Sequence, residues 1–546
     1  MRFKHMNNEA TTIPEALVQG AEAGWAMHFH LDDVMRTLPG DELVDAMFGG
    51  AQVLADRGVG PGGTVGILGP NHPEWVKWAF STWCLGGTVV SLPYSPGLRG
   101  RVPSSERLQP LIQAAECQTV LVHPRFFDEI PPEVAFSWDA SVPSPQARAL
   151  PDLDPEGIAA IQFTSGSTAS PKGATLSHQA ILAASRSNSV NSGLGKDNPT
   201  LAWLPLFHDY GLFGFVTCPL VYGVDAHLMP TELMAKDPAL WFRLIAEVGA
   251  GFTGGPASAW GAALKAALRD PTGIDLSPIV LAVLSAESID PFMVDLILQV
   301  GGQLGLRPGT LLIAYGLAEN VLGATLTTRG TEIRIDEVDI EELATSGRAI
   351  SGGSGASKRI VSSGPPMPGV EVRIANDAGD VPDRHVAEIL LRSPSLMSGY
   401  LGDAPDPFVD GWLRTGDLGY LSDGELFVTG RIKDLIIVMG NNYAPEDIEW
   451  AASRVYGVRP GSCIAFAAPG DGEGHVVVAV EPARDADPDA LPKLVRKAVN
   501  ESVGITVGEV VVLPRGSAPK TTSGKLRRSA LRDAHARGEL TPETVP

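Results

Sequence analysis

Apolar and polar positions alternate with two different periods along the first hundred residues. Between Asp41 and Gly58, apolar residues recur every three or four positions, which predicts an amphipathic helix that Gly58 ends. The apolar run at 64–69 predicts a buried strand, residues 72–87 a helix, and 88–93 another strand. Strands and helices therefore alternate at the spacing of parallel βαβ units.

The same alternation continues further along the chain. Apolar runs predict strands at 201–206, 226–230, 279–286 and 311–316, with helical stretches between them. We therefore expect an α/β fold whose sheets are parallel.

The pattern changes at about residue 371. Short alternating segments bounded by Gly, Asp and Pro predict a small β-rich subdomain over about 365–430. Strands and helices after it predict a compact α+β unit. We expect a large N-terminal domain, 1–430, made of parallel-sheet α/β subdomains and the β-rich one, followed by a small mobile α+β C-terminal domain, 431–546.

Composition and charge exclude several classes of protein. The 546 residues are 44% hydrophobic and 19% charged, which is the composition of a globular protein and not of a disordered one. There are 42 basic and 63 acidic residues, so the formal charge is −21. A surface this negative repels nucleic acid, and any polyphosphate must be received by local cations, backbone N–H groups and a divalent metal.

The spacing of the cysteines and the lack of long apolar runs indicate the cellular compartment to expect for this protein. Four cysteines far apart in the chain form neither a C-x-x-C pair nor a zinc-ligand pattern, so we expect reduced, mostly buried thiols. The N-terminus is polar, and no stretch reaches about 18 uninterrupted apolar residues. We expect a soluble cytoplasmic protein without membrane insertion.

The segment FTSGSTASPKGATLSH, 163–178, is the first motif that carries chemistry. A predicted strand end is followed by a turn rich in Gly, Ser and Thr, then by Lys172. It is not a Walker A loop, because Lys172 lies between Pro171 and Gly173. Backbone N–H groups, hydroxyls and one lysine in such a turn suit the binding of phosphates.

The loop TSGSTASPKG resembles the nucleotide-phosphate loop of the adenylate-forming superfamily, which includes acyl-CoA synthetases, peptide-synthetase adenylation domains, luciferases and fatty acyl-AMP ligases. Five further motifs follow in the family's order, so the resemblance spans about 160–530. They are WLPLFHDYGLFG (203–214), AYGLAEN (314–320), WLRTGDLGYL (412–421), GRIKDLIIVMG (430–440) and PKTTSGKLRR (519–528).

The resemblance implies a reaction between a carboxylate and ATP that releases pyrophosphate, with Mg²⁺ required. Tyr315 would stack on adenine, Glu319 would bind Mg²⁺ as a catalytic ligand, and Asp417, assisted by Arg431, would bind the ribose hydroxyls. The implied nucleotide-binding set is Thr164, Ser165, Gly166, Ser167, Thr168, Lys172, Ala286, Glu287, Tyr315, Gly316, Asp417 and Arg431.

Three residues complete the implied site. His208 would lie between the phosphates and the acyl pocket, and Lys525 would be the catalytic lysine, at the α-phosphate and the attacking carboxylate. Because Lys525 belongs to the small C-terminal domain, closure of that domain would assemble the site. Lys433 would be the hinge of that movement.

Fatty acyl-AMP ligases give the best match within the superfamily. PLFHDYGLFG resembles their motif, and Ala318 stands where CoA ligases more often have Thr. We also expect an insertion at 328–358 without clear core strands. In fatty acyl-AMP ligases such an insertion restricts the domain movement that CoA use requires.

The chain departs from the family pattern in several places. Leu284 and Ser285 stand where Asn-Gly is expected near the adenine pocket, and Tyr443 and Ala444 replace His and Tyr. The helix expected to border the acyl tunnel, within 253–268, is rich in small residues, and Trp260 on it could block that tunnel.

The sequence therefore predicts an ATP- and Mg²⁺-dependent ligase that activates a carboxylic acid, of the fatty type, and transfers it to a phosphopantetheinylated acyl carrier protein. The alternatives are an acyl- or aryl-CoA synthetase and a non-catalytic adenylate-binding module. A carrier protein, if acidic, would need a local basic docking patch, for which Arg527 and Arg528 are the first candidates.

Overall fold

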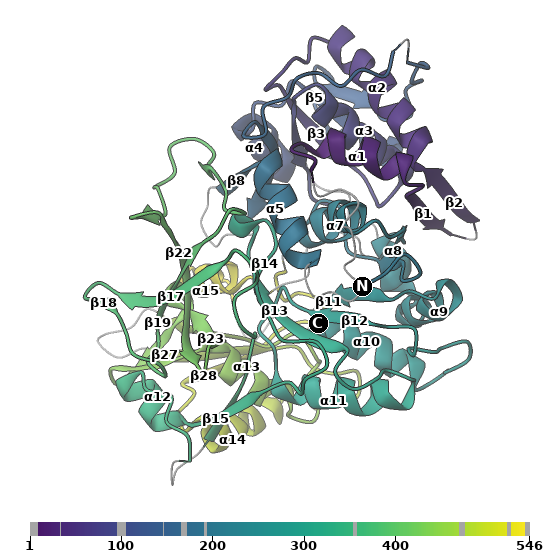
Figure 1. Cartoon of the computed structure of the whole chain (residues 1–546). Helices are drawn as coiled ribbons and strands as arrows, with labels where there is room; N and C mark the ends of the chain where they lie inside the picture. Colours follow the sequence, from purple (N-terminus) through teal and green to yellow (C-terminus); the bar gives the residue numbers. More distant parts are fainter. Residues whose placement is uncertain are drawn as a thin grey trace.

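The computed structural model describes residues 9–32, 34–94, 105–145, 147–164, 172–189, 194–352, 357–468, 475–520 and 526–540. Figure 1 shows an N-terminal lobe in purple at the top, a teal lobe at the lower right, and green strands at the left with the yellow C-terminal elements beside them. The expected combination of parallel-sheet α/β subdomains, a β-rich subdomain and a C-terminal α+β region is confirmed.

The largest sheet is parallel in its interior and antiparallel at both edges. Its strands, in spatial order, are β14 (Gly323–Leu326), β13 (Leu311–Gly316), β12 (Leu281–Leu284), β11 (Phe252–Gly255), β9 (Thr200–Ala202), β10 (Ala226–Leu228), β1 (Ala26–Leu31) and β2 (Val34–Pro39). The helices that connect these strands are α6 (Asp209–Leu212), α7 (Cys218–Tyr222), α8 (Thr231–Lys236), α9 (Pro238–Val248), α10 (Ala257–Ala267) and α11 (Pro291–Gln303).

A second sheet lies mainly in the N-terminal lobe and ends with two antiparallel strands. In spatial order its strands are β20 (Gly399–Tyr400), β8 (Lys172–Ser177), β7 (Ile158–Thr164), β4 (Thr88–Ser91), β3 (Thr64–Leu68), β5 (Thr119–Val122) and β6 (Ala135–Ser137). Its helices are α1 (Ile13–Glu22), α2 (Gly40–Asp56), α3 (Pro73–Cys84), α4 (Ser105–Ala114) and α5 (His178–Ser189). The predicted order of helix, strand, helix and strand over 41–93 is therefore confirmed.

Asn71 joins the two sheets. Its buried side-chain amide donates to the carbonyl oxygens of Leu204 (2.9 Å) and Met229 (3.0 Å), and its Oδ1 accepts the N–H of Leu206 at 3.0 Å. Three hydrogen bonds from one buried group tie the loop after β3 to the segments after β9 and β10. The relative position of the two sheets is thereby fixed.

An antiparallel sheet follows and confirms the predicted β-rich region. Its strands are β18 (Gly379–Asp380), β17 (Glu371–Asn376), β19 (Ala387–Arg392), β22 (Trp412–Ser422) and β21 (Phe408–Val409), with β23 (Glu425–Arg431) also paired to β22.

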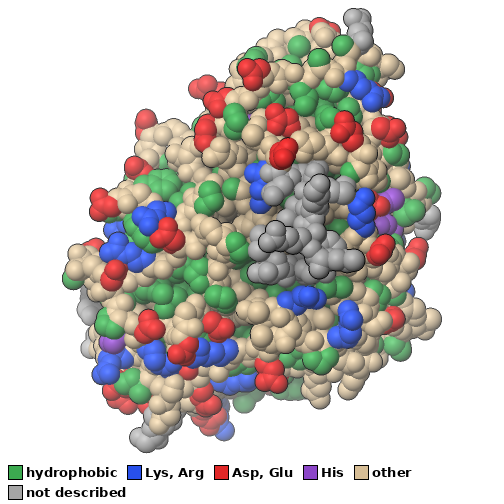
Figure 2. All heavy atoms as spheres, viewed as in Figure 1, with side chains coloured by type: hydrophobic (Ala, Val, Ile, Leu, Met, Phe, Trp, Pro, Cys, Tyr) green, Lys and Arg blue, Asp and Glu red, His purple; other side chains and the backbone are tan. Residues whose placement is uncertain are grey.

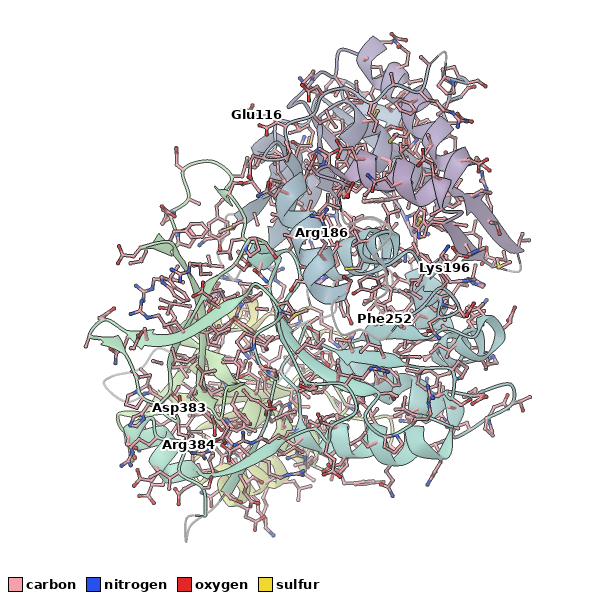
Figure 3. The ribbon with its side chains drawn as sticks, viewed as in Figure 1. Glu116, Arg186, Lys196, Phe252, Asp383 and Arg384 are labelled. Atoms are coloured by element: carbon pink, nitrogen blue, oxygen red, sulfur yellow. The ribbon has the colours of Figure 1, made fainter. Side chains whose placement is uncertain are left out.

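The expectation that 328–358 lacks clear strands was wrong. This segment contains β15 (Ile335–Asp339) and α12 (Ile340–Ser346), and its last two residues begin β16 (Ser357–Val361), which pairs with β15. Val338 and Ile360 pack with Tyr420 of the β-rich sheet in a small core of their own. Asp336 in β15 accepts the Tyr420 hydroxyl at 2.6 Å and pairs with Arg384, which Figure 3 labels.

The C-terminal elements have a core separate from the rest of the chain. They are β24 (Ile436–Val438), β25 (Asn441–Tyr443), α13 (Pro445–Ser453), β26 (Ile464–Ala468), β27 (His475–Val480), α14 (Leu491–Val503), β28 (Glu509–Val512) and α15 (Arg528–Ala536). A boundary at 430/431 and the mobility of this region remain predictions.

All four cysteines are buried free thiols, as expected. Within the described part of the chain, no helix is both long enough and apolar enough to cross a membrane.

Candidate active site

A cleft of about 2550 Å³ lies where the largest sheet, the β-rich sheet and the C-terminal elements meet. The ends of β12 and β13 contribute to one wall, and β22 and β23 to another. Of the predicted site residues within the described ranges, those that line the cleft are Lys172, His208, Ala286, Glu287, Tyr315, Gly316, Glu319, Asp417, Arg431 and Lys433.

Asp417, Arg431 and Tyr315 form a connected polar group in this cleft. Asp417 and Arg431 lie opposite each other in the antiparallel register of β22 and β23, and their side chains form an ion pair. Tyr315 on β13 donates its hydroxyl to Asp417 Oδ2 at 2.8 Å. A carboxylate held in this way at a cleft wall can accept hydrogen bonds from a sugar diol.

Burial and the neighbouring Asp417 carboxylate change the pKa values of Arg431 and Tyr315. Although burial favours the neutral form of Arg431, the Asp417 carboxylate outweighs it and raises the pKa of the guanidinium. Burial and the same carboxylate raise the pKa of Tyr315 well above its ordinary value, so its hydroxyl stays a donor.

The turn after β12 has a left-handed backbone at Ala286, where φ is 74°. The neighbouring Glu287 carboxylate accepts the N–H of Ser258 at 2.8 Å and its hydroxyl at 3.1 Å, so it is bound at the start of α10. Of the two departures expected near the adenine pocket, Leu284 is buried in β12 and Ser285 lines the cleft. Only the Ser285 change therefore reaches the cleft wall.

Glu319 follows β13 and faces the Lys172 region. Tyr400 donates its hydroxyl to Glu319 Oε1 at 2.7 Å, and Lys172 Nζ lies 4.9 Å from the centre of the Tyr400 ring. Burial and the Glu319 carboxylate raise the pKa of Tyr400, which keeps the phenol protonated. A carboxylate at this point of the cleft is a hard-oxygen ligand of the kind that Mg²⁺ prefers, so the residues present fit a magnesium ion.

Part of the predicted phosphate loop lies outside the described residues, namely Ser165, Gly166, Ser167 and Thr168. Its two ends are described, because the backbone of Thr164 pairs with that of Lys172 across β7 and β8.

His208 lines the cleft, and its expected place between the phosphates and the acyl pocket stays a prediction. It precedes α6, accepts the N–H of Tyr210 at 3.3 Å through Nδ1, and lies 2.5 Å from Asp209 Oδ1. Tyr210, two residues further along, is half-buried and lines the same cleft.

Lys433 lines the cleft in a short 3-10 turn, Ile432–Asp434, directly after β23. Burial and the adjacent Arg431 lower its pKa. The predicted catalytic lysine, Lys525, lies outside the described residues. The residues that flank 521–525, Lys520 and Leu526, are joined by an antiparallel bridge, and both line the cleft.

An apolar part of the cleft, which we call the tunnel, is lined by residues of α10 and α11. A Cβ at position 261 would lie 2.8 Å from Met293 Cε, so the end of the Met293 side chain packs against Gly261. The apolar residues that line the tunnel include Phe252, which Figure 3 labels, with Ala257, Gly261, Ala262, Leu264, Leu268, Met293, Leu296 and Val300.

Trp260 does not block this tunnel, contrary to one expectation from the sequence. It does not line the cleft and is fully buried, with its ring centre 4.9 Å from that of Trp241 and 5.4 Å from that of Phe242. Ala257, Gly261 and Ala262 of the same helix line the tunnel, whereas Ala263 and Ala267 are buried in the core.

The expected docking role of Arg528 was also wrong. Its guanidinium is largely buried and pairs with Asp434, Glu446 and Glu449. Burial lowers its pKa but these carboxylates raise it more, and the net effect is an increase. Arg528 therefore has a structural role, whereas Arg527 is exposed at the cleft. On the face in Figure 2, basic and acidic side chains of the described residues are interspersed.

Sequence reasoning missed Tyr400 and Tyr210. Tyr400 contacts Glu319 across 81 positions of the chain, and no motif includes it. Tyr210 is half-buried, and its hydroxyl donates to the Val283 carbonyl at 3.2 Å. Tyr210 belongs to the motif at 203–214, but the motif alone does not show the direction of its side chain.

The fold and the cleft are those of an adenylate-forming enzyme. The family model described as AMP-binding enzyme matches residues 26–401, and the chain belongs to this family.

Its relatives show the resemblance to fatty acyl-AMP ligases. A protein of Caulobacter vibrioides named as an acyl-CoA synthetase is 30% identical over 557 residues, 96% of each chain. The medium-chain-fatty-acid–[acyl-carrier-protein] ligase JamA of Moorena producens is 30% identical over 521 residues, 87% of this chain and 86% of that protein. A structure from work on fatty acyl-adenylate ligases of E. coli and L. pneumophila has a TM-score of 0.91 at 28% identity and covers 98% of this chain and 99% of its own.

Replacement of Asp417 by Asn tests whether this residue binds a ribose diol. Each lost hydrogen bond to a charged acceptor is worth about 1.5–3 kcal/mol, so we expect ATP to bind at least about tenfold more weakly. The Kd of 2′,3′-dideoxy-ATP, which lacks the hydroxyls, should change little. Isothermal titration calorimetry measures both.

The matched control is Asp423→Asn, which removes an exposed ion pair with Arg334 and should change neither Kd. Equal weakening of both nucleotides in Asp417→Asn would show that Asp417 acts only by holding Arg431.

Proposed function

We propose that this ligase joins a fatty carboxylic acid to AMP from ATP and then passes the acyl group to the phosphopantetheine thiol of an acyl carrier protein. The observation that carries the proposal is the meeting, in one cleft, of the Asp417, Arg431 and Tyr315 group, the Glu319 carboxylate and an apolar tunnel.

The first step forms a bond between a carboxylate oxygen and the α-phosphorus of ATP. The bond from that phosphorus to the bridging oxygen breaks, and pyrophosphate leaves with the electron pair. Two anions must approach each other, so positioning and charge neutralisation matter more than proton transfer. Lys172, Arg431 and Lys433 are cations that line the cleft, and we assign Lys525 to the same task.

Mg²⁺, when bound at Glu319, neutralises phosphate charge. The chain's own residues do the rest of the positioning: Asp417 orients the ribose, and His208 stands where the phosphates and the acyl chain meet.

In the second step, the carrier's sulfur attacks the acyl carbon, and AMP leaves as the carbon–oxygen bond breaks. The thiol proton is released to solvent. No cysteine of this chain is needed as nucleophile, because burial raises the pKa of Cys84 and of Cys218 to about 12.

The tunnel favours a fatty acid over a short polar one. Its lining is mostly aliphatic, and each buried methylene of a substrate gains roughly 0.8 kcal/mol. The relative JamA is named for medium-chain fatty acids.

Contacts of the 328–361 segment favour a carrier protein over CoA as acceptor. Lys358 in β16 forms a half-buried ion pair with Asp447 at the start of α13 at 2.6 Å, and α12 packs near β25. The segment is thus linked to both the β-rich sheet and the C-terminal elements. Such links would restrict the domain movement that CoA use requires. JamA is named as an acyl-carrier-protein ligase.

An acyl-CoA synthetase is the second candidate, because the Caulobacter relative carries that name. An assay of the purified protein with ATP, Mg²⁺ and a panel of saturated fatty acids distinguishes the two candidate functions. We expect acid-dependent exchange of labelled pyrophosphate into ATP, and acyl transfer to a phosphopantetheinylated carrier protein but little to CoA.

Abundant acyl-CoA without carrier acylation would contradict the choice of acceptor. Absence of exchange with every acid, although ATP binds, would favour a non-catalytic module.

Lys525→Ala separates the two half-reactions. Removal of a cation from the position where charge develops should lower pyrophosphate exchange by at least about 100-fold. Transfer from a supplied acyl adenylate should be largely retained, because that step breaks no bond at phosphorus. Equal loss in both assays would contradict the assigned role.

The double variant Lys358→Met/Asp447→Asn tests the link to the C-terminal elements. Both partners are changed, because a lone buried charge would itself destabilise the protein. We expect the ratio of acyl-CoA to acylated carrier to rise several-fold while pyrophosphate exchange is unchanged. Mass spectrometry of the two products gives the ratio.

The matched control is Arg359→Met/Asp295→Asn. This neighbouring exposed pair, 2.9 Å apart, links the same segment to α11 and not to the C-terminal elements. A rise in both double variants, or in neither, would contradict the proposed restriction.

A further inference from the structure

Tyr400 contacts both of the charged residues that the proposed function places around the phosphates. Its hydroxyl donates to Glu319 Oε1 at 2.7 Å, and its ring lies 4.9 Å from Lys172 Nζ. None of the sequence motifs includes this tyrosine. A single side chain that contacts a predicted metal ligand and a predicted phosphate ligand suggests a role in arranging them.

The backbone of Tyr400 is fixed relative to Lys172. Tyr400 belongs to the short strand β20, which pairs with β8, and Lys172 is the first residue of β8. The flanking residues add hydrogen bonds to β8, from the Ser398 N–H at 2.9 Å and from the Leu401 N–H at 2.7 Å. The backbone of Tyr400 therefore cannot move away from that of β8 without breaking a sheet edge.

The same segment holds the backbone of Glu319. The Met397 N–H donates to the Glu319 carbonyl at 2.8 Å. Two residues further along, Val321 has a φ of 61°, and the Leu322 N–H donates to the Asn320 carbonyl at 2.6 Å, so a γ-turn fixes the chain there.

Asn320 is fully buried and stabilises this turn. Its Oδ1 accepts the Ser393 hydroxyl at 2.6 Å, and its amide donates to the Gly323 carbonyl at 3.1 Å. With the backbone fixed on both sides, the remaining freedom of Glu319 is rotation of its side chain.

The Tyr400 hydroxyl removes that freedom. An unrestrained glutamate loses rotamer entropy when it binds a cation, whereas one held beforehand has already lost it. The hydrogen bond occupies Oε1, and among the described residues none donates to Oε2. Carboxylates that bind metals are commonly oriented by such a neighbouring donor, and loss of the donor typically weakens metal binding 10- to 100-fold.

We propose that Tyr400 is a positioning residue, which holds the Glu319 carboxylate for a divalent cation and holds Lys172 beside it for the nucleotide phosphates. This inference rests on the proposed function, because that function supplies the cation and the nucleotide.

Tyr400→Phe isolates the hydroxyl, since the ring that faces Lys172 remains. The probe is Mn²⁺, titrated against the full-length protein with ATP and without acid, and followed by electron paramagnetic resonance. We expect about tenfold weaker Mn²⁺ binding or more in the variant. ATP binding in the presence of EDTA should be unchanged, because Lys172 keeps its neighbour.

The control is Tyr420→Phe, which loses an equivalent hydrogen bond to a carboxylate, that of Asp336, at 2.6 Å. Neither residue lines the cleft, so Mn²⁺ binding should match that of the unmodified protein even if the melting temperature falls.

Equal Mn²⁺ affinity in Tyr400→Phe and the unmodified protein would overturn the inference, and so would an equal loss in both tyrosine variants. Failure of the unmodified protein to bind Mn²⁺ with ATP would overturn it as well. The proposed function is tested separately by pyrophosphate exchange in the unmodified protein. If that exchange occurs but Tyr400→Phe binds Mn²⁺ as the unmodified protein does, only the role of Tyr400 is rejected.

Discussion

The ion pair between Asp417 and Arg431 is the constraint on which the rest of the cleft depends. Asp417 is buried and the Arg431 side chain is 47% exposed, and such a pair adds little net stability, because removal of charge from water offsets the attraction. Its effect is geometric. Asp417 also accepts the Tyr315 hydroxyl, so the pair joins the β-rich sheet to the largest sheet, and Arg431 is the last residue before the C-terminal elements. The two sheets are therefore joined through one carboxylate, next to the start of the C-terminal elements.

The charge of the protein adds a second constraint. A chain with a formal charge of −21 would have to bring two more anions together in the proposed reaction, and the cations Lys172, Arg431 and Lys433 line the cleft. Many arginines are paired with carboxylates, as Arg528 at the cleft and Arg384 outside it show. The cleft keeps lysines at Lys172 and Lys433, compact cations on flexible stems that suit phosphates moving along a reaction path.

Much of the fold could be predicted from the sequence. The spacing of apolar residues, and the Gly and Pro residues that end helices and strands, are local properties of the chain. The helix between Asp41 and Gly58 and the strand at Leu311–Gly316 follow from apolar spacing alone. The segment at 328–358 could not be predicted in this way. Its strands β15 and β16 are short and partly polar, and they are held by distant partners such as Tyr420.

The candidate site could likewise be predicted only in part. Motif residues such as Asp417 and Glu319 could be identified from their neighbours in the chain, and they do line one cleft. Contacts between side chains from different motifs could not be predicted from the sequence. Arg528 stands in a basic run of sequence, yet three carboxylates from other elements surround it. Trp260 stands among small residues, but the helix turns it toward Trp241 and away from the tunnel.

The packing of α10 bears on how the range of acids could change. Trp260 packs in the core, whereas Ala257, Gly261 and Ala262 border the tunnel. Substitutions at these three positions would shorten the space for a chain and leave the contact between Trp260 and Trp241 in place. Related copies of the enzyme could therefore diverge toward shorter acids through few mutations in one helix.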